Sequence, residues 1–162
     1  MPERMIVNAS PLIFLSRIGG LPWLGSLCSE AVAAPRAVLQ EIIVGEDGQT
    51  VLNALALEKR IQLVDDCAVP PVVLAWDLGS GESQVLAQCL ARSYAVAVLD
   101  DAAARNCARS LGIPVVGTLG IVLAAKRMAW ISTARPVVEQ LLGEGLYLSS
   151  SLVAAALREV GE

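Results

Sequence analysis

The segment from Ala95 to Gly120 constrains the fold more than any other part of the chain. It begins with a short apolar run, Ala95 to Leu99, continues with two adjacent carboxylates, Asp100 and Asp101, and contains a second apolar run, Ile113 to Val116. Such short runs without polar alternation are typical of strands buried on both faces, as in a parallel sheet. The alanine-rich stretch between them indicates a helix. Because open parallel sheets bind ligands beyond the carboxyl ends of their strands, the two acids mark a candidate site.

The rest of the chain repeats this alternation of short apolar runs with capped, helix-like segments. Strands are expected at Met5–Asn8, Ala31–Ala34 and Ile61–Val64, and a loop at Asp65–Ser80. Helices are expected at Pro11–Ile18, Leu21–Cys28, Pro35–Val44, Gly48–Lys59, Ser80–Tyr94, the stretch ending at Gly112, Leu119–Met128, Arg135–Leu142 and Ser149–Val160. Strands separated by helices predict an α/β protein: a three-layer α/β/α sandwich with a central parallel sheet. The length predicts one domain over residues 1–162.

Composition narrows the chemistry. The chain has no histidine, which excludes Ser-His and Cys-His catalytic pairs, histidine-ligated zinc and an imidazole base. Catalysis would depend on carboxylates, hydroxyls, lysine or arginine, and carboxylates favour a hard cation such as Mg²⁺ or Mn²⁺. The net charge of −4 gives no general support for nucleic-acid binding, which would need a local cluster of cations.

Composition also indicates where the protein works. Apolar residues make up 55% of the chain, yet no run is long enough to span a bilayer, and we expect no membrane association. Met1 to Met5 carries charges and leads directly into a strand, so no signal peptide is expected. The scattered cysteines Cys28, Cys67, Cys89 and Cys107 are expected to be buried, reduced thiols of a cytoplasmic protein. The apolar excess predicts a surface used for oligomerisation.

The candidate site residues share a position at strand ends or helix edges that could face the carboxyl end of the sheet. Each also has a purely structural interpretation. Asp101 is well placed to cap the helix that follows, and Arg105 and Arg109 follow it at intervals of four residues, as in a row of charged side chains on a helix surface. Asp100 is therefore the better candidate for chemistry. A carboxylate near a helix amino terminus, such as Glu82, is stabilised by the helix dipole alone. The full set is Asn8, Glu41, Glu82, Asp100 and Asp101, with Ser10 and Thr118 as helix caps.

Several stretches resemble motifs of the PIN-domain superfamily, in the same order along the chain. They cover nearly its whole length, and they more narrowly resemble a branch of small prokaryotic PIN-like proteins described as predicted nucleic-acid-binding proteins. The stretches are Ile6–Ile13, Pro35–Ile42 with Glu41, Gly81–Ala87 with Glu82, Leu99–Asp101 with Ala104–Arg105, Gly117–Ile121 with Ala125–Lys126, and Gly145–Ser149.

This resemblance implies a Mg²⁺- or Mn²⁺-dependent endoribonuclease, the toxin of a toxin–antitoxin pair, and a homodimer. Its catalytic carboxylates would be Glu41, Glu82 and Asp100, and its metal ligands would also include Asn8 and Asp101. Ser10 and Thr118 would line the site. The cations placed to bind nucleic acid would be Arg17, Arg36, Arg105 and Lys126, together with Arg109.

One position departs from the family pattern. Asn8 stands where the superfamily has its first aspartate, and an amide oxygen ligates a cation without contributing charge. An alternative function is therefore a catalytically impaired PIN-like module that binds RNA or a protein partner. A third alternative, a receiver-like phosphoacceptor, is disfavoured because the acidic pair falls late in the chain rather than after the first strand.

Overall fold

The computed structural model describes residues 1–162 and has a five-stranded parallel sheet at its centre. The strand order is β3-β2-β1-β4-β5, so β1 is flanked by β2 and β4. All neighbouring strands are parallel, and Val7 of β1 is in register with Val98 of β4. The strands are β1 (Arg4–Val7), β2 (Val32–Pro35), β3 (Ile61–Val64), β4 (Ala95–Val98) and β5 (Val115–Val116). The predicted α/β architecture with a central parallel sheet is confirmed.

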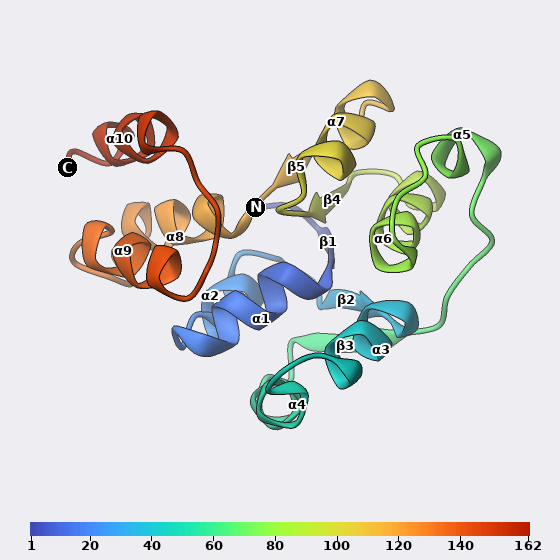
Figure 1. Cartoon of the computed structure of the whole chain (residues 1–162), viewed down its shortest axis with the longest axis horizontal. Coiled ribbons are helices and arrows are strands. Elements are labelled where there is room, and N and C mark those ends of the chain that lie inside the picture. The colour runs from blue at the N-terminus through green and yellow to red at the C-terminus, as the bar shows by residue number, and fades with distance from the viewer.

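Helices cover both faces of the sheet, as Figure 1 shows. Helix α6 packs against β1, β2 and β4, while α1 and α2 lie on the opposite side. The central strands β1, β2 and β4 are therefore buried between two helical layers, as their apolar composition predicts, whereas Gln62 and Leu63 of the edge strand β3 are exposed. The helices are α1 (Ala9–Arg17), α2 (Leu21–Ser26), α3 (Arg36–Val44), α4 (Gly48–Leu57), α5 (Pro71–Leu74), α6 (Ser80–Ala91), α7 (Ala102–Ser110), α8 (Thr118–Arg127), α9 (Arg135–Gly143) and α10 (Ser150–Glu159).

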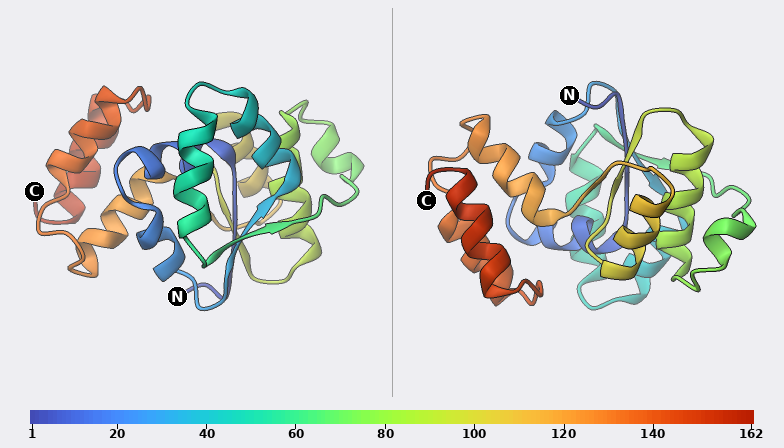
Figure 2. Two further views of the ribbon diagram at one scale, coloured as in Figure 1. Left: turned by 90° about the horizontal axis from the view of Figure 1, so that it is seen from below. Right: turned by 90° about the horizontal axis from the view of Figure 1, so that it is seen from above.

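The three last helices form a layer of their own beside α1 and α2 (Figures 1 and 2). They enclose a second hydrophobic cluster that is separate from the main core around the sheet. Phe14, Ile18 and Trp23 of the α1–α2 region pack against this cluster and join it to the rest of the chain. No helix combines the length and the apolar composition that crossing a bilayer requires.

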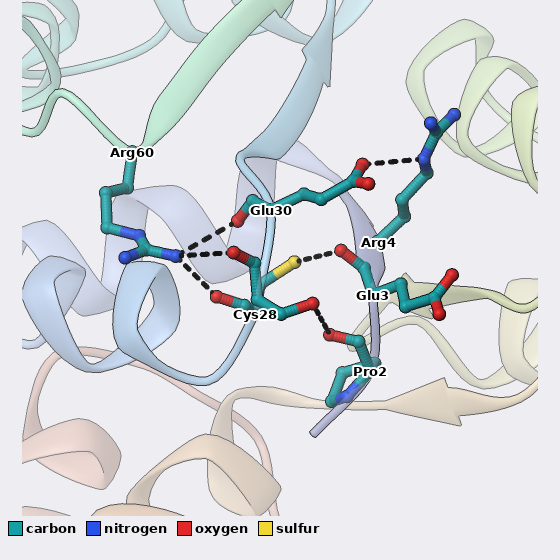
Figure 3. Close-up of polar contacts among 7 residues, drawn as sticks. Pro2, Glu3, Arg4, Cys28, Glu30 and Arg60 are labelled. Atoms are coloured by element: carbon teal, nitrogen blue, oxygen red, sulfur yellow. Dashed lines mark hydrogen bonds and ion pairs between the residues drawn. The ribbon is translucent and has the colours of Figure 1, made fainter.

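Polar contacts tie together the strands at their amino-terminal edge (Figure 3). One nitrogen of Arg60, just before β3, donates to the carbonyl oxygens of Cys28, Ser29 and Glu30, the closest at 2.6 Å. The Glu30 side chain in turn pairs with Arg4 of β1 at 2.8 Å. The carboxyl-terminal edge, where the candidate site lies, is thereby left free of this structural network.

The structure differs from the sequence-based expectations in a few places. The loop expected at Asp65–Ser80 contains the short helix α5, which begins at the Pro70-Pro71 pair because proline suits the first turn of a helix. Helix α1 begins two residues before Pro11, so Ser10 lies within its first turn and does not cap it. Cys67 is exposed, whereas the other three cysteines are buried, and no disulfide is present.

Candidate functional site

The topology brings the candidate residues together at the carboxyl end of the two central strands. Asn8 directly follows β1, and its backbone N–H donates to the carbonyl oxygen of Val98 in β4 at 3.1 Å. Asp100 lies two residues beyond the end of β4. Glu41 comes from the middle of α3 and Glu82 from the first turn of α6, and these two helices pack against each other.

Gly81 is the point around which Asn8 and Glu41 converge. The Gly81 N–H donates to Oε1 of Glu41 at 2.8 Å. A Cβ atom at position 81 would lie 2.7 Å from Oδ1 of Asn8 and 2.8 Å from each carboxylate oxygen of Glu41. Any side chain larger than that of glycine would therefore displace these oxygens or the helix that carries residue 81.

Glu82 lies beside this pair. The Asn8 amide nitrogen donates to Oε1 of Glu82 at 3.4 Å, a long hydrogen bond. Burial raises the pKa of Glu82 above its ordinary value, and the nearby negative charges of Asp101 and Glu41 raise it further. The side chain is therefore a stronger base than an exposed glutamate.

Asp100 is held by three donors, which fix both of its oxygens. Oδ1 accepts the Thr118 backbone N–H at 2.7 Å. Oδ2 accepts the hydroxyls of Thr118 at 2.7 Å and Ser10 at 2.8 Å. Because Thr118 is fully buried, this carboxylate is held in one orientation at the start of α8. The two hydroxyls thus lie beside Asp100, and neither acts as a helix cap.

Asp101 has the structural role that its position predicts, because its Oδ1 accepts the Ala104 N–H at 2.8 Å and caps α7. Its charge still contributes to the shifted pKa of Glu82. Arg105, one turn into α7, donates to the carbonyl oxygen of Leu99 at 2.9 Å. Its guanidinium and Oδ1 of Asp100 both lie close to Gly117, since a Cβ atom there would be 2.8 Å from Nη1 of Arg105 and 3.0 Å from Oδ1 of Asp100.

Three of the other predicted nucleic-acid-binding cations are not gathered at this site, whereas Arg109 lies one turn after Arg105 on α7. Arg17 ends α1 and forms ion pairs with Asp47 and Glu144, at 3.7 and 3.9 Å. Lys126 lies in the last turn of α8, where its ammonium pairs with Glu162 at 3.6 Å. Arg36 begins α3 but is paired with Asp65 at 2.6 Å. Arg17, Arg36 and Lys126 are thus engaged by carboxylates, and only the arginines of α7 lie near Asp100.

The sequence reasoning did not identify Gln84, which positions the segment after β3. Its side-chain amide donates to the Cys67 carbonyl at 2.7 Å and accepts the Cys67 N–H at 2.9 Å. Gln88, one turn later, donates to the Asp65 carbonyl at 2.9 Å. These glutamines fall within a helix whose apolar stripe dominates its pattern, and only their burial distinguishes them.

The residues present fit a hard cation by donor chemistry. Oδ1 of Asn8 is buried and has no hydrogen-bond donor, although a buried carbonyl oxygen normally has one. It lies with the Glu41 carboxylate on the same side of Gly81, and together with Glu82 these side chains provide oxygen donors, which Mg²⁺ and Mn²⁺ prefer. No three acidic, histidine or cysteine side chains are grouped closely enough to hold a metal ion by themselves, so the set includes the Asn8 amide.

Comparisons with known proteins identify the class. The model of the family DUF3368, described as a PIN domain, matches residues 4–162. The chain belongs to this PIN-domain family. A comparison with curated protein sequences finds no match.

A solved structure with the same fold is that of the PIN domain endonuclease Utp24, to which this chain is similar with a TM-score of 0.54 and 13% sequence identity. The likeness covers 72% of this chain and 85% of that one. It confirms the PIN-like fold, and membership of the family supports a nuclease-like function.

Proposed function

We propose that the protein is a divalent-metal-dependent endoribonuclease whose site is built from Asn8, Glu41, Glu82 and Asp100. The observation that carries the proposal is the convergence of the orphaned Asn8 oxygen and the Glu41 carboxylate on one side of Gly81, in a PIN-domain chain. Glu82 and the anchored Asp100 lie at the same edge of the sheet.

The residues have distinct roles in this proposal. Asn8 and Glu41 would hold Mg²⁺ or Mn²⁺, with Glu82 beside them and with Asp101, the cap of α7, as an outer ligand. A bound ion would neutralise phosphate charge and acidify a water molecule. Glu82, whose pKa is raised, accepts a proton from the attacking water. Ser10 and Thr118 hold Asp100 so that its carboxylate does not rotate during turnover.

The test is cleavage of RNA by the purified protein with Mg²⁺, with Mn²⁺ and with EDTA. Glu82→Gln and Asp100→Asn should each lower the rate at least about a hundredfold, the usual scale for losing a positioned acid, base or charge. Glu139→Gln, at an exposed carboxylate on α9, is the matched control and should cleave like the wild type. Absence of metal-dependent cleavage, or equal cleavage by all variants, would contradict the proposal.

A catalytically impaired module that binds RNA or a protein partner is the second candidate. It is favoured by the uncharged Asn8 at the first acidic position and by the lack of three grouped carboxylates. Calorimetric titration with Mn²⁺ separates the two. Stoichiometric binding that Glu41→Gln abolishes supports the nuclease, whereas absence of binding supports the impaired module.

We further propose that the protein is a cytoplasmic homodimeric toxin, neutralised by a small antitoxin. Exposed apolar side chains support a protein partner: Ile43 and Val44 end α3 and are 58% and 84% exposed, and Leu57 ends α4 and is 85% exposed. Light scattering on the isolated protein tests the dimer. Growth arrest on expression, relieved by the product of a neighbouring small gene, tests the toxin–antitoxin assignment.

A further inference from the structure

A groove extends from Asp100 away from the Asn8–Glu41 pair and has a volume of about 520 Å³. Helix α7 forms one wall, and the segment Leu146–Ser149 with α10 forms the other. The start of α8 lies at its floor, and Figure 1 shows β5 and the start of α8 between the two walls. The volume is within the range of pockets for small ligands, enough for about one or two nucleotides.

The α7 wall is positively charged. Arg105 and Arg109 are one helical turn apart, both line the groove, and neither forms an ion pair. Burial, reinforced by the positive charge of Arg109, lowers the pKa of the Arg105 guanidinium. Two like charges held this close on one wall favour an anion between them.

Two carboxylates, Asp100 and Glu159, also line the groove. Glu159 is paired with Arg127 at 2.9 Å. Asp100 already accepts three hydrogen bonds at the inner end of the groove. Both carboxylates thus have partners of their own, whereas the guanidiniums of α7 donate only to the Leu99 carbonyl and to Oδ1 of Asn106 and stay available to an anion.

The opposite wall is apolar and carries an exposed aromatic ring. Tyr147 lines the groove and is 92% exposed. Leu152, in the first turn of α10, is 48% exposed beside it. An exposed ring opposite unpaired arginines matches single-stranded nucleic acid, whose phosphates bind the cations and whose unpaired bases stack on aromatic side chains.

We propose that this groove binds an unpaired stretch of RNA beside the cleaved bond. Arg105 and Arg109 contact its phosphates, and Tyr147 stacks on a base. The proposal rests on the proposed endoribonuclease function and specifies which surface of this chain contacts the substrate beside the cleaved bond. It assigns binding roles to Arg109 and Tyr147 and connects the carboxyl-terminal layer of helices to the site at Asp100.

The experiment measures the Kd of a fluorescein-labelled 12-nucleotide single-stranded RNA by anisotropy, in EDTA so that metal-dependent cleavage is absent. Tyr147→Ala should raise Kd about tenfold, the scale of one lost stacking contact, and Tyr147→Phe should restore binding. Arg109→Gln should raise Kd severalfold and reduce the slope of log Kd against log salt by about one. A self-complementary duplex of equal length should bind more weakly and respond little to Tyr147→Ala.

Tyr94→Asn and Arg4→Gln are the matched controls, because both residues are exposed and lie away from the groove. Tyr94 has φ 64°, which asparagine tolerates. The proposal is overturned if Tyr147→Ala and Arg109→Gln bind like these controls, if the duplex binds as tightly as the single strand, or if no RNA binds. Tyr147-dependent binding without metal-dependent cleavage by the wild type would instead refute the endoribonuclease and leave the groove assignment intact.

Discussion

The Ser10 hydroxyl donates a 2.8 Å hydrogen bond to Oδ2 of Asp100, a residue 90 positions away. This bond links the first turn of α1 to the end of β4, and Thr118 connects the same carboxylate to the start of α8. Three segments that follow separate strands are thus fixed by one side chain. Asp100 therefore both stabilises the fold and presents a preformed acidic group at the edge of the sheet.

Thr118→Val tests this dual role. Valine retains the shape of threonine but removes a charge-assisted hydrogen bond of 2.7 Å at a fully buried position. We expect the free energy of unfolding in urea to fall by about 1.5–3 kcal/mol. Thr50→Val, at an exposed position of α4, is the control. Equal stability of the two variants would show that the Thr118 hydroxyl does not hold Asp100.

The raised pKa of Glu82 predicts how stability changes with pH. Because the folded state binds this proton more tightly than the unfolded chain, stability is lost as pH rises from the unfolded pKa through the folded one. Glu82→Gln should remove this loss, so in EDTA the variant should gain stability over the wild type above that window and match it at lower pH. If the free energy of unfolding depends on pH in the same way for Glu82→Gln and for the exposed Glu139→Gln, the raised pKa of Glu82 would be contradicted.

Thiol reactivity tests the burial of the cysteines. Cys67 is exposed, whereas Cys28, Cys89 and Cys107 are buried. Burial raises the pKa of Cys89 to about 12, so at pH 8 roughly one molecule in ten thousand carries its thiolate. We expect one thiol to react rapidly with Ellman's reagent and four to react in guanidinium. Cys67→Ser should abolish the fast phase, and a second fast thiol in the folded protein would contradict this packing.

The fold was largely predictable because its signals are local. Short apolar runs placed all five strands, and Ile61–Val64 matches its predicted bounds. Glu82 in the first turn of α6 and Asp101 as the cap of α7 are likewise local features. The helix α5 was missed because a single turn carries too little periodicity to be detected.

The parts of the site that were not predictable depend on contacts between distant segments. Ser10 looks like a helix cap until β4 places Asp100 beside it. Gly81 looks like a helix lead-in until α3 brings Glu41 against its Cα atom. Arg17 and Lys126 looked available for nucleic acid because their carboxylate partners come from remote loops and from the last residue.

Asn8→Asp tests whether the missing charge limits the metal site. The amide oxygen at this position is buried, has no donor and lies close to Glu41 and Glu82. A carboxylate introduced there adds like charge, so in EDTA the free energy of unfolding should fall by about 2 kcal/mol or more. Mn²⁺ should reverse this loss, because the added charge strengthens binding by about tenfold or more.

The measurement is the urea midpoint of the wild type and Asn8→Asp, with EDTA and with increasing Mn²⁺, together with calorimetric Mn²⁺ binding. Asn53→Asp, an exposed position on α4, is the matched control because it adds the same charge away from the site. Since a ligand stabilises only the state that binds it, the Mn²⁺-dependent gain should be largest for Asn8→Asp. Equal Mn²⁺ affinity in all three proteins would place the metal away from Asn8, and the orphaned oxygen would then need another explanation.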